Sequence, residues 1–176
     1  MSDPAPDAPP LLPLPLSMAL RRAEPADLPW ILHQEGRPEF AAGIVRWSPE
    51  THQLKVRDPD VAYHLAVEPS GQPAGYAILT GLTLPHRAIY LQRIVIAAPG
   101  QGRGRIFLRL LCEEVFSRLH AHRFWLHVFP GNDRAMAVYR SLGFQVEGVM
   151  REAVLQGERY QDGVVMAMLD REFSCI

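Results

Sequence analysis

The chain has 176 residues, of which 48% are hydrophobic and 21% are charged, and its formal net charge is −1. That length suits one domain with a core of its own, and the balance of residues is ordinary for a globular protein. The near-neutral charge gives no reason to expect nucleic acid or an acidic membrane surface as a partner.

The first 17 residues are rich in proline, with six of the 16 prolines among the first 15 positions. Proline lacks an N–H donor, so this segment cannot form a regular helix or a central strand. It has no basic start and no long apolar run, so we expect no signal peptide and no membrane span. We predict an extended or disordered tail over residues 1–17, with a proline-rich docking segment as the alternative, and a single domain over residues 18–176.

The residues after the tail predict a strand followed by two helices. Residues 18–23 alternate enough for a strand, and residues 24–36 have a helical pattern. Ser48 and Pro49 suit the N-cap and the first position of a second helix. Residues 38–47, between the two helices, are compatible with a short helix or a loop.

A β-meander is predicted next, over residues 61–68, 73–82 and 88–97. The first of these strands alternates, whereas the second half of the third is apolar on both faces. A strand that is apolar on both faces belongs in the middle of a sheet. We therefore place residues 88–97 centrally.

The second half of the chain predicts a helix over 104–119, a buried strand over 124–129 and a helix over 132–143. It closes with a hairpin whose strands cover 144–155 and 159–169. The whole pattern is α/β with a mixed sheet, antiparallel at both ends and containing one strand–loop–helix–strand crossover.

A glycine-rich loop, with Gly100, Gly102 and Gly104, leads from the central strand into the helix after it. Glycine allows the close approach and the left-handed angles of a phosphate cradle, and a helix start offers free N–H groups. A Walker loop needs Lys-Ser/Thr here, and a dinucleotide fingerprint needs glycine where Arg105 or Phe107 stands. An anion site of another kind is therefore favoured over both nucleotide sites and over a merely flexible connection.

The loop resembles the Gln/Arg-x-x-Gly-x-Gly/Ala pyrophosphate loop of the GNAT superfamily of N-acetyltransferases. It reads Gln101-Gly102-Arg103-Gly104-Arg105-Ile106, and Ile106 departs from the family's Gly or Ala. A second family pattern, Asn-x-x-Ala-x-x-x-Tyr-x-x-x-Gly-Phe, is complete in Asn132, Ala135, Tyr139, Gly143 and Phe144. The closing hairpin resembles that of the branch containing ribosomal-protein N-terminal acetyltransferases. Together the resemblance covers roughly residues 18–170.

The resemblance implies a GNAT fold: a central, mostly antiparallel sheet of six or seven strands, splayed between strands 4 and 5 and flanked by about four helices. It also implies acetyl-CoA as co-substrate. The pyrophosphate would lie on residues 101–106, and the pantetheine arm beside the backbone of Ile94, Val95 and Ile96 and the side chain of Asn132. The arginines at positions 103, 105, 109, 134 and 140 could serve the remaining phosphate, although each also suits an ordinary surface arginine.

Tyr139 is the predicted general acid. It lies seven residues after Asn132, close to two helical turns, so both side chains share one face. A phenol and a thiol have comparable intrinsic acidities, so Tyr139 could protonate a leaving thiolate. Core packing for Tyr139 and helix capping for Asn132 are the alternative roles.

The sequence offers several candidates for the general base, because Tyr90 stands where many members of the family have glutamate. His127 and Glu35 are our candidates, with Glu39 and Glu152 also open. A structural histidine and a solvated acidic face are the respective alternatives. The pair His120 and His122 follows a helix without acidic or thiol partners nearby in the sequence, so we expect no metal.

We therefore predict an acetyl-CoA-dependent N-acetyltransferase that acts on a primary amine of a small molecule or a protein N-terminus, by direct attack in a ternary complex. The alternatives are a non-catalytic acyl-CoA-binding or sensing module of the same fold, and a nucleotide-binding regulator. We expect no nucleic-acid or membrane partner, and a monomer or homodimer. Because Cys112 and Cys175 are too few for a disulfide framework, we expect a reducing cytoplasm.

Overall fold

The computed structural model describes residues 17–40 and 43–173, so the predicted tail lies outside it apart from Ser17, and its character stays a prediction. The centre is a seven-stranded sheet in the order β1-β2-β3-β4-β5-β7-β6. Only β4 and β5 pair in parallel, so the predicted mixed, mostly antiparallel sheet is confirmed. The strands are β1 Ala19–Arg22, β2 Val61–Val67, β3 Pro73–Thr80, β4 Ala88–Ile96, β5 Arg123–Val128, β6 Gln145–Gln156 and β7 Arg159–Leu169.

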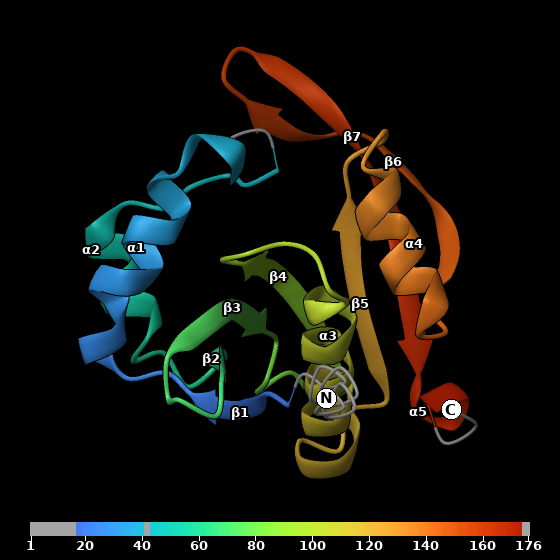
Figure 1. Cartoon of the computed structure of the whole chain (residues 1–176). Coiled ribbons are helices and arrows are strands. Elements are labelled where there is room, and N and C mark those ends of the chain that lie inside the picture. Colours follow the sequence, from blue (N-terminus) through green and yellow to red (C-terminus); the bar gives the residue numbers. More distant parts are fainter. Residues whose placement is uncertain (1–16, 41–42, 174–176) are drawn as a thin grey trace, which may run out of the picture.

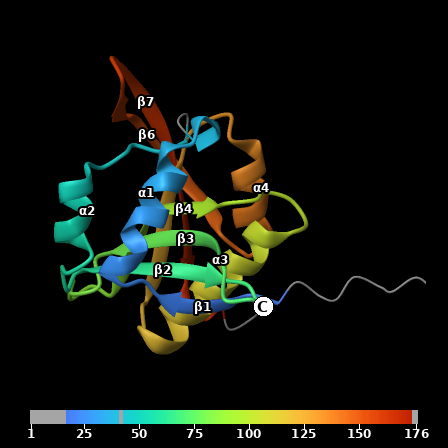
Figure 2. The same cartoon turned by 60° about the vertical axis from the view of Figure 1, so that its left-hand side comes forward.

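Helices cover both faces of the sheet (Figures 1 and 2). In the described part of the chain they are α1 Leu28–Gly36, α2 Pro49–Lys55, α3 Arg103–Glu113, α4 Asp133–Ser141 and the single turn α5 Asp170–Phe173. The α1 and α2 pair lies on one face, and α3 and α4 lie on the other. Because α5 is only one turn long, α1 to α4 form the two layers, in agreement with the roughly four flanking helices that the resemblance implies.

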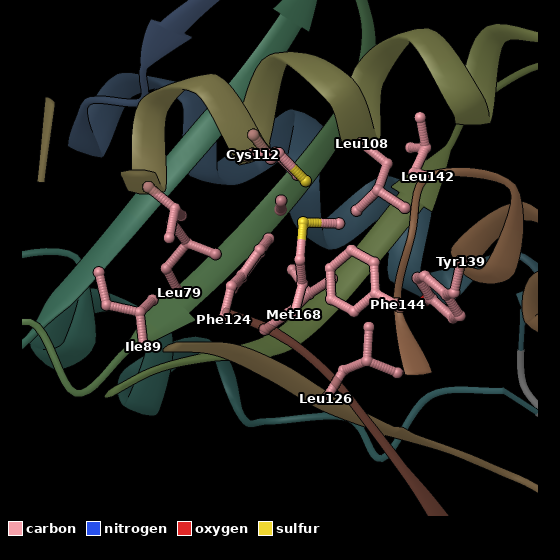
Figure 3. Close-up of a cluster of buried hydrophobic side chains, with 14 of the residues drawn as sticks. Leu79, Ile89, Leu108, Cys112, Phe124, Leu126, Tyr139, Leu142, Phe144 and Met168 are labelled. Carbon is pink, nitrogen blue, oxygen red and sulfur yellow. The ribbon is translucent and has the colours of Figure 1, made fainter. Parts of the chain in front are cut away.

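Each face has its own apolar core. Under α3, the side chains of Leu108 and Cys112 pack against Leu79, Phe124 and Met168 (Figure 3). The opposite core joins α1 to the other side of β2 and β3, through residues that include Leu28, Ile31, Tyr63 and Tyr76. The alternation of a strand serves both layers, because successive side chains point to opposite faces.

The helix boundaries follow local chemistry. Ser48 caps α2 as predicted, its hydroxyl accepting from the Thr51 N–H at 3.2 Å. The helix predicted over 104–119 begins at Arg103 and ends in a wider π turn, Glu114–Arg118, in which Leu119 N–H reaches Glu114 O at 2.9 Å. Of the ambiguous residues 38–47, Pro38–Phe40 forms a 3₁₀ turn and residues 44–47 have no regular structure.

A β-bulge in β4 changes the face to which its side chains point. Ile78 of β3 pairs with Arg93 and the next residue, Leu79, pairs with Leu91, so Gln92 is the extra residue. Leu91 faces the α3 core, whereas Arg93 faces α1. Bulges often redirect side chains beside active sites. This one lies in β4, the strand whose backbone is predicted to bind the cofactor.

Candidate active site

The sheet opens between β4 and β5. Their parallel pairing is confined to residues 88–90 and 123–125, and beyond these residues the two strands diverge. From Leu91 onward, β4 pairs only with β3, so its other edge offers free N–H and C=O groups to an added chain. This is the splay between strands 4 and 5 that the resemblance implies. It leaves the backbone of Ile94, Val95 and Ile96 at the opening.

The glycine loop forms one wall of a cleft of about 990 Å³, which runs along this opening. Gln101 and Gly102 take left-handed φ angles of 53° and 74°, and Gly102 is the N-cap of α3. In residues 17–40 and 43–173, the N–H groups of Gln101, Gly102 and Gly104 have no backbone acceptor. Free N–H groups at a helix start, without side chains at the glycines, fit a phosphate group.

Three arginines line the same cleft: Arg103, Arg105 and Arg134. Arg103 forms an ion pair with Glu68 at 2.7 Å, and Arg105 donates to the Ser141 carbonyl at 3.4 Å. Arg134 is exposed. Their positive charge reinforces the anion site.

Ile106 does not line the cleft, although the sequence motif includes it. It lies in the first turn of α3, where its N–H donates to Gly102 O at 3.1 Å. The lining contributed by α3 consists of Arg103, Gly104, Arg105 and Leu108. The Ile106 side chain therefore does not narrow the cleft.

A smaller cavity of about 180 Å³ lies at the divergence of β4 and β5. It shares Ile94, Asn132 and Tyr139 with the large cleft, so the two spaces adjoin. Asn132 caps α4 by accepting from the Ala135 N–H at 3.2 Å. The backbone N–H of Asn132 donates to Phe129 O at 3.2 Å, whereas its side-chain Nδ2 has no partner in the described residues. Asn132 and Tyr139, the two candidates from the α4 motif, both line the opening.

The Tyr139 side chain reaches this cavity from the α3 side of the sheet, where its ring packs near Phe144 with centroids 5.8 Å apart. Its hydroxyl makes no hydrogen bond in the described part of the chain. Burial raises the pKa of Tyr139 above its ordinary value, and the Tyr90 phenol adds to the rise. Tyr139 is therefore a neutral phenol with its proton free to donate.

His127 lines the same small cavity from β5. The side chains of Leu126 and Val128 are buried in the α3 core, so His127 points to the other face, as strand alternation predicts. Its Nδ1 lies 2.6 Å from the Tyr90 hydroxyl oxygen. Burial lowers the pKa of His127 and raises that of Tyr90 to about 12. Both groups are therefore neutral near pH 7.

Gly163 of β7 gives the His127 ring its space. A Cβ at Gly163 would lie 3.3 Å from His127 Cβ and 3.4 Å from ring atoms Cγ and Cδ2. Tyr90 and Gly163 thus fix the imidazole from two neighbouring strands. The sequence contains no signal for either contact, because both depend on strand register.

Of the other candidate bases, Glu35 is buried on α1, with a side chain that is 3% exposed and outside the lining of both cavities. Glu39 lines the rim of the large cleft and forms an ion pair with Arg37. Glu152 is exposed on β6, where its N–H donates to Asp162 at 2.8 Å. The small cavity therefore brings His127 and Tyr139 together, and none of these three carboxylates lines it. A base role for Glu35 stays a prediction.

No cluster of three or more ligand-type side chains suited to a metal occurs among residues 17–40 and 43–173. In the same residues, no helix is long and apolar enough to span a membrane.

The split mixed sheet and the loop of free amides at the start of α3 are features that the resemblance in the sequence implies. The family model described as "Acetyltransferase (GNAT) family" matches residues 19–144, and the chain belongs to this family. It is an acetyl-CoA-dependent N-acetyltransferase. This confirms the enzyme class expected from the two sequence motifs.

Two kinds of curated relative are similar to the chain. The spermidine N(1)-acetyltransferase of Escherichia coli K12 is 27% identical over 170 residues, which cover 89% of this chain and 88% of that protein. The [ribosomal protein bS18]-alanine N-acetyltransferase of the same strain is 29% identical over 145 residues, covering 82% and 93%. Among solved structures, spermidine N-acetyltransferase from Vibrio cholerae in complex with CoA and spermine has a TM-score of 0.79 at 23% identity, covering 89% and 98%. That likeness confirms the fold.

Proposed function

We propose that this enzyme transfers the acetyl group to a primary amine, carried by a small molecule or by a protein N-terminus, and that the amine attacks directly while both substrates are bound. The observation that carries the proposal is the adjoining pair of spaces. A long cleft with a phosphate cradle meets a small cavity that holds both Tyr139 and His127. Two substrates can therefore be bound at once with their reacting ends together.

The long cleft suits acetyl-CoA. The free amides of Gln101, Gly102 and Gly104 would receive the pyrophosphate, with Arg103 and Arg105 beside it. Pantetheine would lie along the unpaired edge of β4 at residues 94–96 and accept a hydrogen bond from Asn132. Bound there, acetyl-CoA supplies the thioester. An N–H of the unpaired β4 edge can polarise the carbonyl oxygen of this thioester.

Tyr139 and His127 enter the small cavity from opposite faces of the sheet, which suits opposite proton roles. The amine nitrogen forms a bond to the thioester carbon, and the carbon–sulfur bond breaks. Tyr139 donates its proton to the leaving sulfur. His127 Nε2 accepts the proton that the amine loses, and this requires the tautomer whose Nδ1 proton is donated to the Tyr90 oxygen.

Direct attack is favoured over a covalent acetyl-enzyme by the state of the described cysteine. Cys112 is 1% exposed and packs in the core under α3, and burial raises the pKa of its thiol to about 12. A buried thiol that stays protonated is a poor nucleophile. The same free thiol agrees with the reducing cytoplasm expected from the sequence, which we retain as part of the proposal.

The test is CoA release by the purified protein with acetyl-CoA and a panel of acceptors. The panel pairs each peptide that has a free α-amine with the same peptide blocked at that amine, and it includes spermidine and free amino acids. We expect release with free amines alone, and initial-rate lines that intersect when both substrates are varied. Parallel lines, together with acetylated protein in mass spectra taken without acceptor, would show a covalent intermediate and overturn direct attack.

A further inference from the structure

A buried ion pair on the α1 side of the sheet joins Arg93 of β4 to Glu35 of α1. Both side chains are 3% exposed. Glu35 Oε1 accepts from Arg93 Nη1 and from the Tyr76 hydroxyl at 2.8 Å, and His52 Nε2 lies 3.4 Å from the same oxygen. None of these contacts involves the reacting atoms that we assign to Tyr139 and His127, so the cluster needs a separate explanation.

The ionisation of Glu35 follows from its neighbours. Burial alone would raise its pKa, but the contact with His52, the charge of Arg93 and the Tyr76 hydroxyl together hold the pKa below its usual value. Glu35 is therefore a carboxylate at neutral pH. Its charge compensates that of Arg93, since an unpaired charge in the interior is strongly destabilising.

Arg93 has a second group of contacts, with the irregular segment 43–47. Its Nη2 donates to the Val45 carbonyl, and its guanidinium carbon lies 5.0 Å from the centre of the Trp47 ring. Residues 43–45 form a wall of the small cavity. In the described part of the chain, no backbone hydrogen bond joins residues 44–47 to the sheet. The Arg93 side chain is therefore the main polar tie between this wall and β4.

The bulge at Gln92 makes this tie possible. Without it, strand alternation would point position 93 into the α3 core with Leu91, away from Glu35 and Val45. With it, one guanidinium reaches the α1 carboxylate and the cavity wall together. The planar fork of arginine suits two acceptors in different directions, and a lysine ammonium on its flexible stem does not reproduce it.

We propose that Arg93 is a positioning residue that fixes the 43–47 wall of the acceptor cavity through Val45, with Glu35 as its counter-charge. The part that concerns acceptor affinity rests on the proposed function, because it places the amine in the small cavity. The part that concerns the wall itself rests only on the contacts of Arg93. The two parts are tested by different measurements.

The central variant is Arg93→Lys. Its matched control is Arg22→Lys, because Arg22 also donates to a backbone carbonyl, that of Val61 at 2.9 Å, away from both cavities. Backbone ¹⁵N NMR order parameters are measured over residues 43–47 in the protein without substrates, because the hydrogen bond from Arg93 is to a carbonyl in this segment. We expect the order parameters there to fall from the range of rigid backbone, about 0.85, toward that of flexible backbone, below about 0.6, in Arg93→Lys, and to stay unchanged in Arg22→Lys.

The kinetic test uses the best acceptor of the panel. We expect Arg93→Lys to raise the acceptor KM about tenfold, with kcat and the Kd of acetyl-CoA within about twofold of the wild type. A Glu35→Leu/Arg93→Met double variant removes both charges together and tolerates burial, but it still lacks the bond to Val45, so it should behave in the same way.

Unchanged order parameters over residues 43–47 in folded Arg93→Lys, or in the double variant if Arg93→Lys does not fold, overturn the proposal. A loss of kcat at constant KM would overturn it too, because it would mark Arg93 or Glu35 as acting on the reaction itself. If no acceptor reacts with the wild type, the proposed function fails, yet the order parameters still decide whether Arg93 holds the wall.

Discussion

Replacing Tyr139 by phenylalanine removes one hydroxyl and retains the ring that packs near Phe144. That hydroxyl has no hydrogen-bond partner in the described part of the chain, so its removal leaves no donor or acceptor unsatisfied. A typical intramolecular hydrogen bond contributes about 1 kcal/mol, and here none is lost. We therefore expect the free energy of unfolding of Tyr139→Phe to equal or slightly exceed that of the wild type.

The effect of the same substitution on the rate should be large. A positioned general acid contributes roughly 10²- to 10⁴-fold, which corresponds to about 3–5 kcal/mol of barrier. We expect kcat to fall by about 10²-fold or more, with the Kd of acetyl-CoA within about threefold, because the ring still fills its place on the cleft wall. CoA release gives kcat, calorimetry gives the Kd, and urea unfolding gives the stability. Tyr160→Phe is the matched control, since Tyr160 is an exposed tyrosine of β7.

In Tyr139→Phe the acid role predicts a lower kcat with an unchanged free energy of unfolding, and this combination distinguishes it from a structural role. A structural tyrosine would show the opposite pattern, with lost stability and a nearly normal rate in the folded fraction. Equal rates for wild type and Tyr139→Phe at every pH would refute the acid role.

Two glycines give further predictions, each with its own reason. Gly163→Ala should lower kcat roughly tenfold without changing the Kd of acetyl-CoA, because the new Cβ would displace the His127 ring by a few tenths of an ångström; CoA release and calorimetry measure the two quantities. Gly102→Ala should cost about 1 kcal/mol of stability, since its φ of 74° is left-handed, and should also weaken acetyl-CoA binding. Gly71→Ala is the control for the second variant, because Gly71 has a φ of 82° in the β2–β3 turn, so the strain should be similar while the Kd stays constant. An unchanged Kd in Gly102→Ala would contradict the role of the loop as a phosphate cradle.

Local patterns were enough to predict much of the fold. The alternation over residues 61–68, the doubly apolar end of β4 and the cap at Ser48 depend on neighbours in the sequence, and all three are confirmed. The π turn at Glu114–Arg118 was not predicted, because the apolar spacing of a helix is nearly the same whether its last turn is α or π.

The site was predictable where a motif is local and obscure where it depends on pairing between strands. The loop at residues 101–104 and the pair Asn132 and Tyr139 lie in continuous stretches, and the structure brings them to one opening. The contact of His127 with Tyr90 depends on the parallel register of β4 and β5. The bulge that turns Arg93 toward Glu35 is equally invisible in the sequence, because one extra residue inverts the face of every side chain after it.

Ile106 shows the limit of a motif taken without its structure. In the sequence it is the position that departs from the family pattern, and it raises the question of crowding at the phosphate. In the structure the lining of the cleft passes from Arg105 to Leu108, so the bulk at position 106 does not reach it. The N–H of Ile106 belongs to the first turn of α3 and is already bonded to Gly102.

The most direct test of the mechanism is the pH dependence of kcat/KM in the wild type and in His127→Gln, with one acceptor amine for both. Burial lowers the pKa of His127 below its usual 6.5. Only the neutral imidazole can accept a proton, so the wild-type rate should fall as the pH drops through that lowered pKa. We expect His127→Gln to be slower by about 10²-fold at pH 7 and to lack this acidic limb. The same acidic limb in both proteins, at similar rates, would contradict the assignment of His127 as the base.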